Sequence, residues 1–468
     1  MPTTSLRGMQ VFFAIWLGQL VSLVGSGLTG FALGLWVYQR SGSVTQFAFI
    51  ALFTVLPNIL LSPVAGVLVD RWDRRWTMIL SDAGAALSTL AVAVLFLTGR
   101  LEVWHIYLAA ATISACSAFQ TPAYLALITL LVPKQQLGRT GGMVQIGQAA
   151  SDILAPALAG LLVVTIQVWG VLLIDFATFL FAVLTLLVVR VPEHKVIARD
   201  KHGRQSLLSE AAYGWTYIAA RPGLLGLLIF LAATNFFLGG MVGPLITPML
   251  LEIASPQVLG IVISIAGSGM LVSSLAMSAW GGPQRRIAGL LGFELLCGLF
   301  MVTMGLRPSP WLIAIGAFGV HFTLPIINGS NLAIWQSKVA PDVQGRVFAA
   351  QQAIAKAATP LAYLAAGPLA DRVFGPALVS GGPLAGSVGQ IVGVGPGRGI
   401  GLLFIVMGIL TVLATAVAYL NPRIRLVEEE LPDAVAGEGA VGIAEAHRVG
   451  LTSESGKGQA GLGDDLHI

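Results

Sequence analysis

The stretch that decides the fold is Gly66-Val67-Leu68-Val69-Asp70-Arg71-Trp72-Asp73-Arg74-Arg75. It lies between two long apolar runs and carries three arginines and two aspartates in a chain that is only 10% charged. A short charged hairpin between two membrane-length segments has to lie in water at one face of a membrane. Because basic residues are enriched in cytoplasmic loops, that face is predicted to be the cytoplasmic one.

The composition excludes a soluble protein. The 468 residues are 56% hydrophobic with a mean hydropathy of +0.84, whereas a soluble chain would carry about 25% charged residues. The many glycines suit helices that pack closely in lipid. The net charge of +4 is scattered, so no nucleic-acid surface is indicated. Cys116 and Cys297 lie in apolar segments and define neither a disulfide framework nor a metal site, and no cofactor is indicated.

Twelve apolar segments are long enough to cross a membrane, at about twenty residues each. Their approximate ranges are 9–38, 44–69, 76–98, 104–131, 143–166, 168–190, 224–250, 256–280, 287–306, 310–337, 347–371 and 400–420. We therefore predict an all-α membrane protein with twelve transmembrane helices in two six-helix, pseudo-symmetric bundles. The predicted parts are an N-terminal bundle (1–190), a cytoplasmic linker with an interfacial helix (191–223), a C-terminal bundle (224–420) and a disordered cytoplasmic tail (421–468).

The distribution of basic residues fixes the predicted orientation. With both termini in the cytoplasm, twenty of the 26 lysines and arginines lie in cytoplasmic segments. The Gly-rich segment 373–399 is then on the outer side, where its composition favours turns or a re-entrant loop rather than a helix. The chain is expected in the cell (inner) membrane.

A weak internal repeat supports two related halves. The loop at 132–139 after the fourth span and the loop at 340–346 after the tenth span both end in Gly-Arg and open a new helix. The second and eighth spans end in the charged loops 66–75 and 281–286. Two six-span halves with matching loops are typical of a duplicated transporter.

The opening stretch resembles the signature of the major facilitator superfamily, Gly-x-Leu-Ala-Asp-Arg-x-Gly-Arg-Arg/Lys. The central loops resemble those of the drug-exporter branch of that family, which includes macrolide-efflux and enterobactin-exporter proteins. The matching residues are Gly66, Leu68, Asp70, Arg71, Arg74 and Arg75. Asp73 stands where the family has a glycine. The resemblance implies that Gly66, Asp70, Arg71, Arg74 and Arg75 form a gating loop that latches the two halves on the cytoplasmic side; the simpler alternative is that they only enforce topology.

The fifth span partly resembles the family's antiporter signature Gly-Pro-x-x-Gly-Gly, since Pro156 and Gly160 match it. In the family this segment marks exporters and seals the halves on the outer side. The same span carries Asp152, and charges inside spans are candidate functional residues. Asp152, then Asp175 and Lys356, are the candidates for proton coupling, because burial favours the neutral form of a carboxyl group. Asp82 and Glu294 lie nearer span ends and are interpreted as structural charges.

Polar side chains form stripes along the first, fourth and tenth spans, and the seventh span offers Asn235 and Phe237. In the first span Gln19, Ser22, Ser26 and Thr29 recur every three or four residues, so they share one helical face. The resemblance implies that the first, fourth, seventh and tenth spans line a central cavity, although serine and threonine often bond only their own helix. The predicted cavity residues are Gln19, Ser22, Ser26, Thr121, Tyr124, Asn235, Phe237, His321, Asn328 and Asn331.

These features predict a secondary active transporter, not an enzyme. No nucleotide-binding Gly-x-x-x-x-Gly-Lys loop is present, so the energy has to come from an ion or substrate gradient. The expected activity is export of a small amphipathic molecule, such as a drug, a macrolide or a siderophore-like compound, by alternating access as a proton antiporter. The partners are the substrate, protons and the lipid bilayer, and the chain is expected to act as a monomer. There are two alternatives. The protein could be an importer or facilitator of the same fold, or it could be a membrane scaffold or sensor.

Overall fold

The fold is almost entirely helical. The computed structural model describes residues 3–69, 72–132, 137–189, 207–340 and 343–431, and no strand occurs in these ranges. Ten of the described helical segments are long and apolar enough to cross a membrane. Two further helices, α4 and α13, have 29 and 25 residues and correspond to the fourth and eleventh predicted spans. The predicted all-α membrane fold is confirmed.

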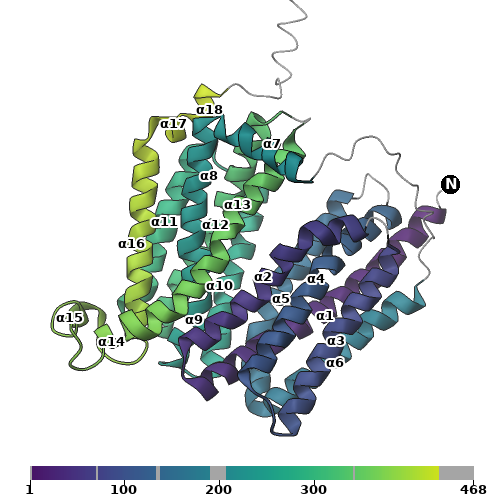
Figure 1. Cartoon of the computed structure of the whole chain (residues 1–468), viewed down its shortest axis with the longest axis horizontal. Helices are drawn as coiled ribbons and strands as arrows, with labels where there is room; N and C mark the ends of the chain where they lie inside the picture. The colour runs from purple at the N-terminus through teal and green to yellow at the C-terminus, as the bar shows by residue number, and fades with distance from the viewer. Residues whose placement is uncertain (1–2, 70–71, 133–136, 190–206, 341–342, 432–468) are drawn as a thin grey trace, which may run out of the picture.

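Six long helices form the N-terminal bundle, side by side in Figure 1. They are α1 (Thr3–Ser41), α2 (Val44–Val69), α3 (Arg74–Leu97), α4 (Val103–Leu131), α5 (Leu137–Thr165) and α6 (Gln167–Val188). The turn between α1 and α2 needs only two residues because Gly42 has a φ of 61°, in the left-handed region that favours glycine.

The second group of helices forms the C-terminal bundle. They are α8 (Pro222–Asn235), η2 (Phe236–Val242), α9 (Gly243–Leu251), α10 (Pro256–Trp280), α11 (Arg286–Leu306), α12 (Pro310–Lys338), α13 (Gln344–Pro368), η3 (Leu369–Phe374), α14 (Gly375–Ala377), α15 (Val388–Val392) and α16 (Arg398–Leu420). The seventh span is one continuous run of α8, η2 and α9. Its central turns are π-helical where Gly240 approaches Ala362 of α13 and Pro244 lacks a backbone donor.

Short helices flank the C-terminal bundle. The helix α7 (Leu207–Ala219) precedes α8, and α17 (Pro422–Arg425) and α18 (Val427–Glu430) follow α16. Ile424 and Val427 are buried, and Glu428 accepts a hydrogen bond from the backbone N–H of Ile287 at 2.9 Å. Residues 421–431 therefore differ from the disordered tail expected from the sequence; residues 190–206 and 432–468 lie outside the described residues.

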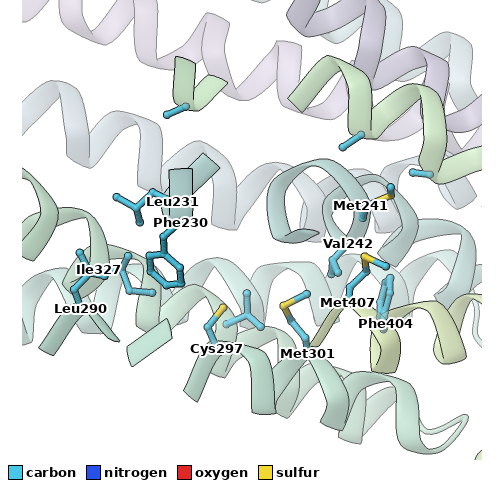
Figure 2. Packing of buried hydrophobic residues seen from close by; sticks show 14 of the residues in the cluster. Phe230, Leu231, Met241, Val242, Leu290, Cys297, Met301, Ile327, Phe404 and Met407 are labelled. Carbon is cyan, nitrogen blue, oxygen red and sulfur yellow. The ribbon is translucent and has the colours of Figure 1, made fainter. Parts of the chain in front are cut away.

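One large apolar cluster extends through most of the C-terminal bundle. Figure 2 shows part of this core, in which Phe230 of α8 lies near Ile327 of α12, and Phe404 of α16 lies near Met407 of the same helix. The same cluster includes Tyr38 and Val44 from the N-terminal bundle. The core is therefore continuous between the bundles at the end where α1 stops and α2 starts.

Polar side chains lie between the two larger apolar clusters of the N-terminal bundle. One cluster contains Phe12 of α1 and Met78 of α3, and the other contains Leu28 of α1 and Val92 of α3. The intervening residues of the helices α1, α3 and α4 include most of the predicted cavity stripes. The layer between these two clusters is mixed: it holds the polar stripes and a small third apolar cluster of Ala85, Ala86 and Phe179.

Figure 1 also shows how the bundles sit relative to each other. They converge at the face that carries the α1–α2 turn, which we call the closed face, and diverge toward the face that carries the N-terminus and α7. In the topology predicted from the basic residues, the closed face is the outer one.

Candidate functional site

The N-terminal bundle holds a cavity of about 340 Å³ within this mixed layer. Five predicted cavity residues line it: Gln19, Ser22, Ser26, Thr121 and Tyr124. Gln120 and Gln148 also line it, although the sequence analysis did not single them out.

A fully buried acid bonds two of the residues that line this cavity, Gln19 and Gln120, without lining it itself. Asp82 of α3 is 0% exposed, and its Oδ2 accepts a hydrogen bond from Nε2 of Gln19 at 3.0 Å. Its Oδ1 accepts from Nε2 of Gln120, which also donates to Oε1 of Gln19 at 2.9 Å. Three helices thus converge on one carboxyl group whose two oxygens are both bonded. These hydrogen bonds fit the interpretation of Asp82 as a structural charge, although the sequence did not identify its partners.

The C-terminal bundle holds a second cavity of about 410 Å³. Three predicted residues line it: Asn235, Asn328 and Asn331. Glu294 of α11 lines it as well, is 5% exposed, and accepts a hydrogen bond at Oε1 from Oγ1 of Thr234 at 3.1 Å. Here the sequence placed a cavity acid among the structural charges.

Two predicted cavity residues line neither cavity. The ring of Phe237 packs edge to face against Phe236, with centroids 5.9 Å apart. Nδ1 of His321 lies 2.9 Å from the carbonyl oxygen of Ala317, one turn earlier in α12, and donates to it. Both residues are fixed by contacts within their own helices.

The proton-coupling candidates occupy different surroundings. Oδ1 of Asp152 accepts a hydrogen bond at 3.0 Å from Gln148, and Asp152 interacts electrostatically with His321 across the two bundles. Asp175 is 1% exposed inside the N-terminal bundle, where Oδ2 accepts from Oγ1 of Thr89 at 3.2 Å and Oδ1 has no hydrogen-bond partner. Lys356 lies in α13, and its side chain is outside the described residues.

The predicted gating loop is only partly described. Gly66 lies in the last turn of α2, and Asp70 and Arg71 are outside the described residues. Nε of Arg75 donates to the carbonyl of Leu186 at 2.7 Å, and Nη1 of Arg74 to the carbonyl of Ala126 at 3.3 Å. Both arginines thus bond carbonyls near the ends of helices in their own bundle, where the helix dipole favours a cation. In this conformation they do not bridge the halves.

Arg286 repeats the contact of Arg74 in the second bundle. Its Nη1 donates to the carbonyl of Ala333 at 3.0 Å. Arg74 and Arg286 each open a helix, and Ala126 and Ala333 each lie five residues before the end of a 29-residue helix. This matched pair of contacts supports the duplication that the loops indicate.

An aspartate closes the other face of the molecule. Oδ1 of Asp371, in η3, accepts from the backbone N–H of Val44 at 3.1 Å. Oδ2 accepts from the N–H and hydroxyl of Thr45 at 2.9 and 2.7 Å and from the hydroxyl of Ser43 at 3.0 Å. A carboxylate from the C-terminal bundle thus caps the first turn of α2, where free N–H groups and the helix dipole favour a negative charge.

A sequence signal for Asp371 was available. The six residues 367–372, Gly-Pro-Leu-Ala-Asp-Arg, repeat the Gly-x-Leu-x-Asp-Arg pattern of residues 66–71. One copy ends the second span and the other ends the eleventh. The second copy lies outside the loop between the second and third spans, to which the family signature applies.

Two further contacts join the bundles at the closed face. The hydroxyl of Tyr38 in α1 donates to Oε1 of Glu252, which follows α9. Gly160 of α5 and Gly260 of α10 pack reciprocally: a Cβ on Gly160 would lie 2.7 Å from the carbonyl oxygen of Pro256, and one on Gly260 would collide with that of Pro156. The predicted sealing segment with Pro156 and Gly160 therefore lies between the bundles, as the resemblance implies.

Comparison with known proteins agrees with this architecture. The Major Facilitator Superfamily profile matches residues 15–363. Macrolide efflux protein A of Streptococcus pyogenes is 28% identical over 368 residues, covering 77% of this chain and 90% of that protein. The multidrug efflux pump Tap of Mycolicibacterium fortuitum is 25% identical over 365 residues, covering 75% and 87%.

The fold recurs in solved structures. A bacterial homologue of the human lysosomal transporter Spinster, in an inward-facing and unoccupied conformation, matches with a TM-score of 0.67 and 17% identity over 91% of this chain and 98% of that one. The family and these relatives are transporters, and the efflux proteins among them confirm the resemblance to the drug-exporter branch. This multi-pass membrane protein belongs to the Major Facilitator Superfamily.

Proposed function

We propose that this chain exports small amphipathic molecules from the cytoplasm by alternating access, in exchange for protons. The observation that carries the proposal is that each bundle holds a polar cavity while contacts between the bundles close one face. Export rather than import is favoured because macrolide efflux protein A and the multidrug pump Tap are similar over most of their length. The chain works as a monomer in the inner membrane, with both termini in the cytoplasm.

The two Gly-x-Leu-x-Asp-Arg copies give the alternation a physical basis. Asp371 caps the start of α2 at the closed face. Asp70 directly follows the last residue of α2 in the sequence, in the position of the family's cytoplasmic latch. Because α2 and α13 run along each other between the bundles, a carboxylate at the end of each helix can stabilise one of two states. The closed face is held by Asp371 in the present state, and Asp70 acts in the other.

Proton coupling is assigned to Asp152. Gln148, which lines the N-terminal cavity, donates a hydrogen bond to this carboxyl group. His321 of the other bundle interacts with the same carboxyl group electrostatically. An acid at the boundary of two bundles changes its surroundings when they move, so its proton affinity can differ between the two states. Asp175 and Lys356 are the secondary candidates.

Transport into inside-out membrane vesicles tests the proposal. With an acidic lumen, which corresponds to the outside of the cell, vesicles containing the protein should accumulate a labelled macrolide or a fluorescent dye, and collapse of the pH gradient should abolish accumulation. Asp152→Asn should abolish the gradient-driven part, and Asp152→Glu should restore some of it. Accumulation only with the opposite gradient would show an importer, and accumulation independent of any gradient would show a facilitator.

A further inference from the structure

The cavity of the C-terminal bundle contains an acid that has no basic partner in the part of the chain that the structure describes. Glu294 is almost fully buried, and a single hydroxyl, that of Thr234, bonds its carboxyl group. Among the described residues, no lysine, arginine or histidine pairs with it. A buried carboxylate without a counter-charge is unfavourable, so the site favours a positive group or a proton.

Two other polar atoms in the wall of the same cavity have no partner. Oδ1 of Asn331 and Nε1 of Trp335 are both buried without a hydrogen bond, and Trp335 is only 1% exposed. The two residues are four apart in α12 and so lie on one helical face. Buried polar groups are nearly always bonded in proteins, so a free acceptor and a free donor beside an acid indicate a place for a ligand.

The N-terminal bundle contains the matching position, and there the acid is satisfied. Asp82 follows Arg74 by eight residues, as Glu294 follows Arg286, and each arginine opens its helix. The two carboxylate oxygens of Asp82 accept from Gln19 and Gln120.

One difference between the halves is the counterpart of Gln120, one of the two amides that bond Asp82. Gln120 is eleven residues before the end of α4, and the residue at that place in α12 is Ile327, which lines the C-terminal cavity. The second bundle therefore keeps the acid and replaces this amide with an apolar side chain.

From these observations we propose that the C-terminal cavity binds an organic cation, namely a protonated amine on an amphipathic molecule that also carries an oxygen acceptor. The ammonium group bonds Glu294 and Oδ1 of Asn331, and the oxygen accepts from Nε1 of Trp335. The apolar part of the ligand lies along Ile327 and Leu231, which line the same cavity. A volume of about 410 Å³ suits a small drug-like molecule. The proposal names a substrate class for the proposed exporter and in that respect rests on the proposed function.

Binding to the purified full-length protein in detergent tests this site without requiring transport. Dansylcadaverine carries a free ammonium group, and N-acetyl-dansylcadaverine has the same fluorophore and chain without the charge. Fluorescence titration should show at least about tenfold tighter binding of the charged probe, and Glu294→Gln should remove that preference. Glu430→Gln, an exposed acid-to-amide change on α18, should leave it intact.

Two further variants keep the test informative if Glu294→Gln does not fold. Ile327→Gln supplies the amide that the N-terminal copy has, so it should satisfy Glu294 internally and weaken dansylcadaverine binding, whereas Ile327→Leu should not. Asp82→Asn should leave the preference for the charged probe intact, because that acid is already bonded.

Equal binding of the two probes by the wild type, or loss of the preference in Asp82→Asn but not in Glu294→Gln, would overturn the proposal. Charge-selective binding without gradient-driven transport would instead refute the proposed function and leave the cation site standing.

Discussion

At the scale of single residues, Asp73 shows how a departure from a family pattern can have a local reason. Its Oδ1 accepts from the backbone N–H of Trp76 at 2.8 Å, and its φ and ψ of −66° and 118° are those of an N-cap. The aspartate therefore starts α3, a task for which glycine is also suited. The substitution strengthens the start of the helix that carries Asp82.

Asp73→Ala should loosen the first turn of α3 by about 1 kcal/mol, and Asp73→Gly by only a few tenths. Faster amide hydrogen exchange in a peptide that covers residues 74–78 of the Ala variant is the expected result. Asp73→Ser is the matched control, because a serine hydroxyl also caps a helix, and its exchange should stay near that of the wild type. Equal exchange in the Ala and Ser variants would contradict the cap.

Several single residues of the candidate site could be predicted from the sequence. Gln19, Ser26 and Asn331 line the cavities, because polar residues spaced by three or four along an apolar span have to share one face. The sequence interpreted Asp82 and Glu294 as structural charges, and the hydrogen bonds of Asp82 fit that interpretation, whereas Glu294 lines a cavity. Depth along a span is visible in the sequence, but the partners of Asp82 come from α1 and α4, and neither amide is near it in the chain.

At the scale of helices, the contact between α5 and α10 depends on a pair of small residues. Gly160 and Gly260 each follow a proline by four residues, and each approaches the carbonyl of the other helix's proline. Oγ of Ser264 adds a hydrogen bond to the carbonyl of Ile153 at 2.6 Å. Close backbone approach of this kind is what small residues allow in membrane helices.

Gly160→Val should therefore push α5 away from α10, since its Cβ would lie 2.7 Å from the carbonyl oxygen of Pro256. An overpacking cost of about 1–3 kcal/mol predicts a lower thermal unfolding midpoint and reduced transport. Gly141→Ala is the control in the same helix, because a Cβ there meets nothing within 4 Å. Unchanged melting of Gly160→Val would show that the two helices separate without cost.

The span boundaries were predictable because each span requires its own run of apolar residues, independent of the rest of the fold. The π-helical turns of η2 were not, since they depend on how Gly240 meets Ala362 more than a hundred residues later in the chain. The same holds for residues 421–431: their charged sequence suggested disorder, but Ile424 and Val427 are buried against the bundle.

At the scale of the whole molecule, the closed face depends on contacts between residues that lie far apart in the sequence. Thr45 and Asp371 are 326 positions apart, so local patterns could not reveal their pairing. The carboxylate of Asp371 accepts four hydrogen bonds from the start of α2, and two of these come from backbone N–H groups of the first helical turn. It links the bundles directly, whereas Arg74 and Arg75 bond only within their own bundle.

Removing that link should shift the population of the two states. Hydrogen bonds to a charged group contribute about 1.5–3 kcal/mol each when one partner is lost, so a net loss of about 2 kcal/mol in Asp371→Ala favours opening of the closed face by roughly thirtyfold. Spin labels at Gln39 and Ser255, exposed positions in the two bundles, report the change as a longer distance in double electron–electron resonance. Arg372→Gln is the neighbouring control and should leave the distance distribution unchanged.

The reciprocal latch makes a stronger prediction for the double variant. If Asp371 stabilises one state and Asp70 the other, Asp70→Ala should shorten the mean label distance on the closed face, while Asp371→Ala lengthens it. The equilibrium depends on the difference between the two states, so two losses of similar size at distant sites should nearly cancel. The double variant should therefore recover a distribution close to that of the wild type, although each state is less stable. A double variant that instead behaves like Asp371→Ala alone would show that Asp70 fixes topology and takes no part in switching.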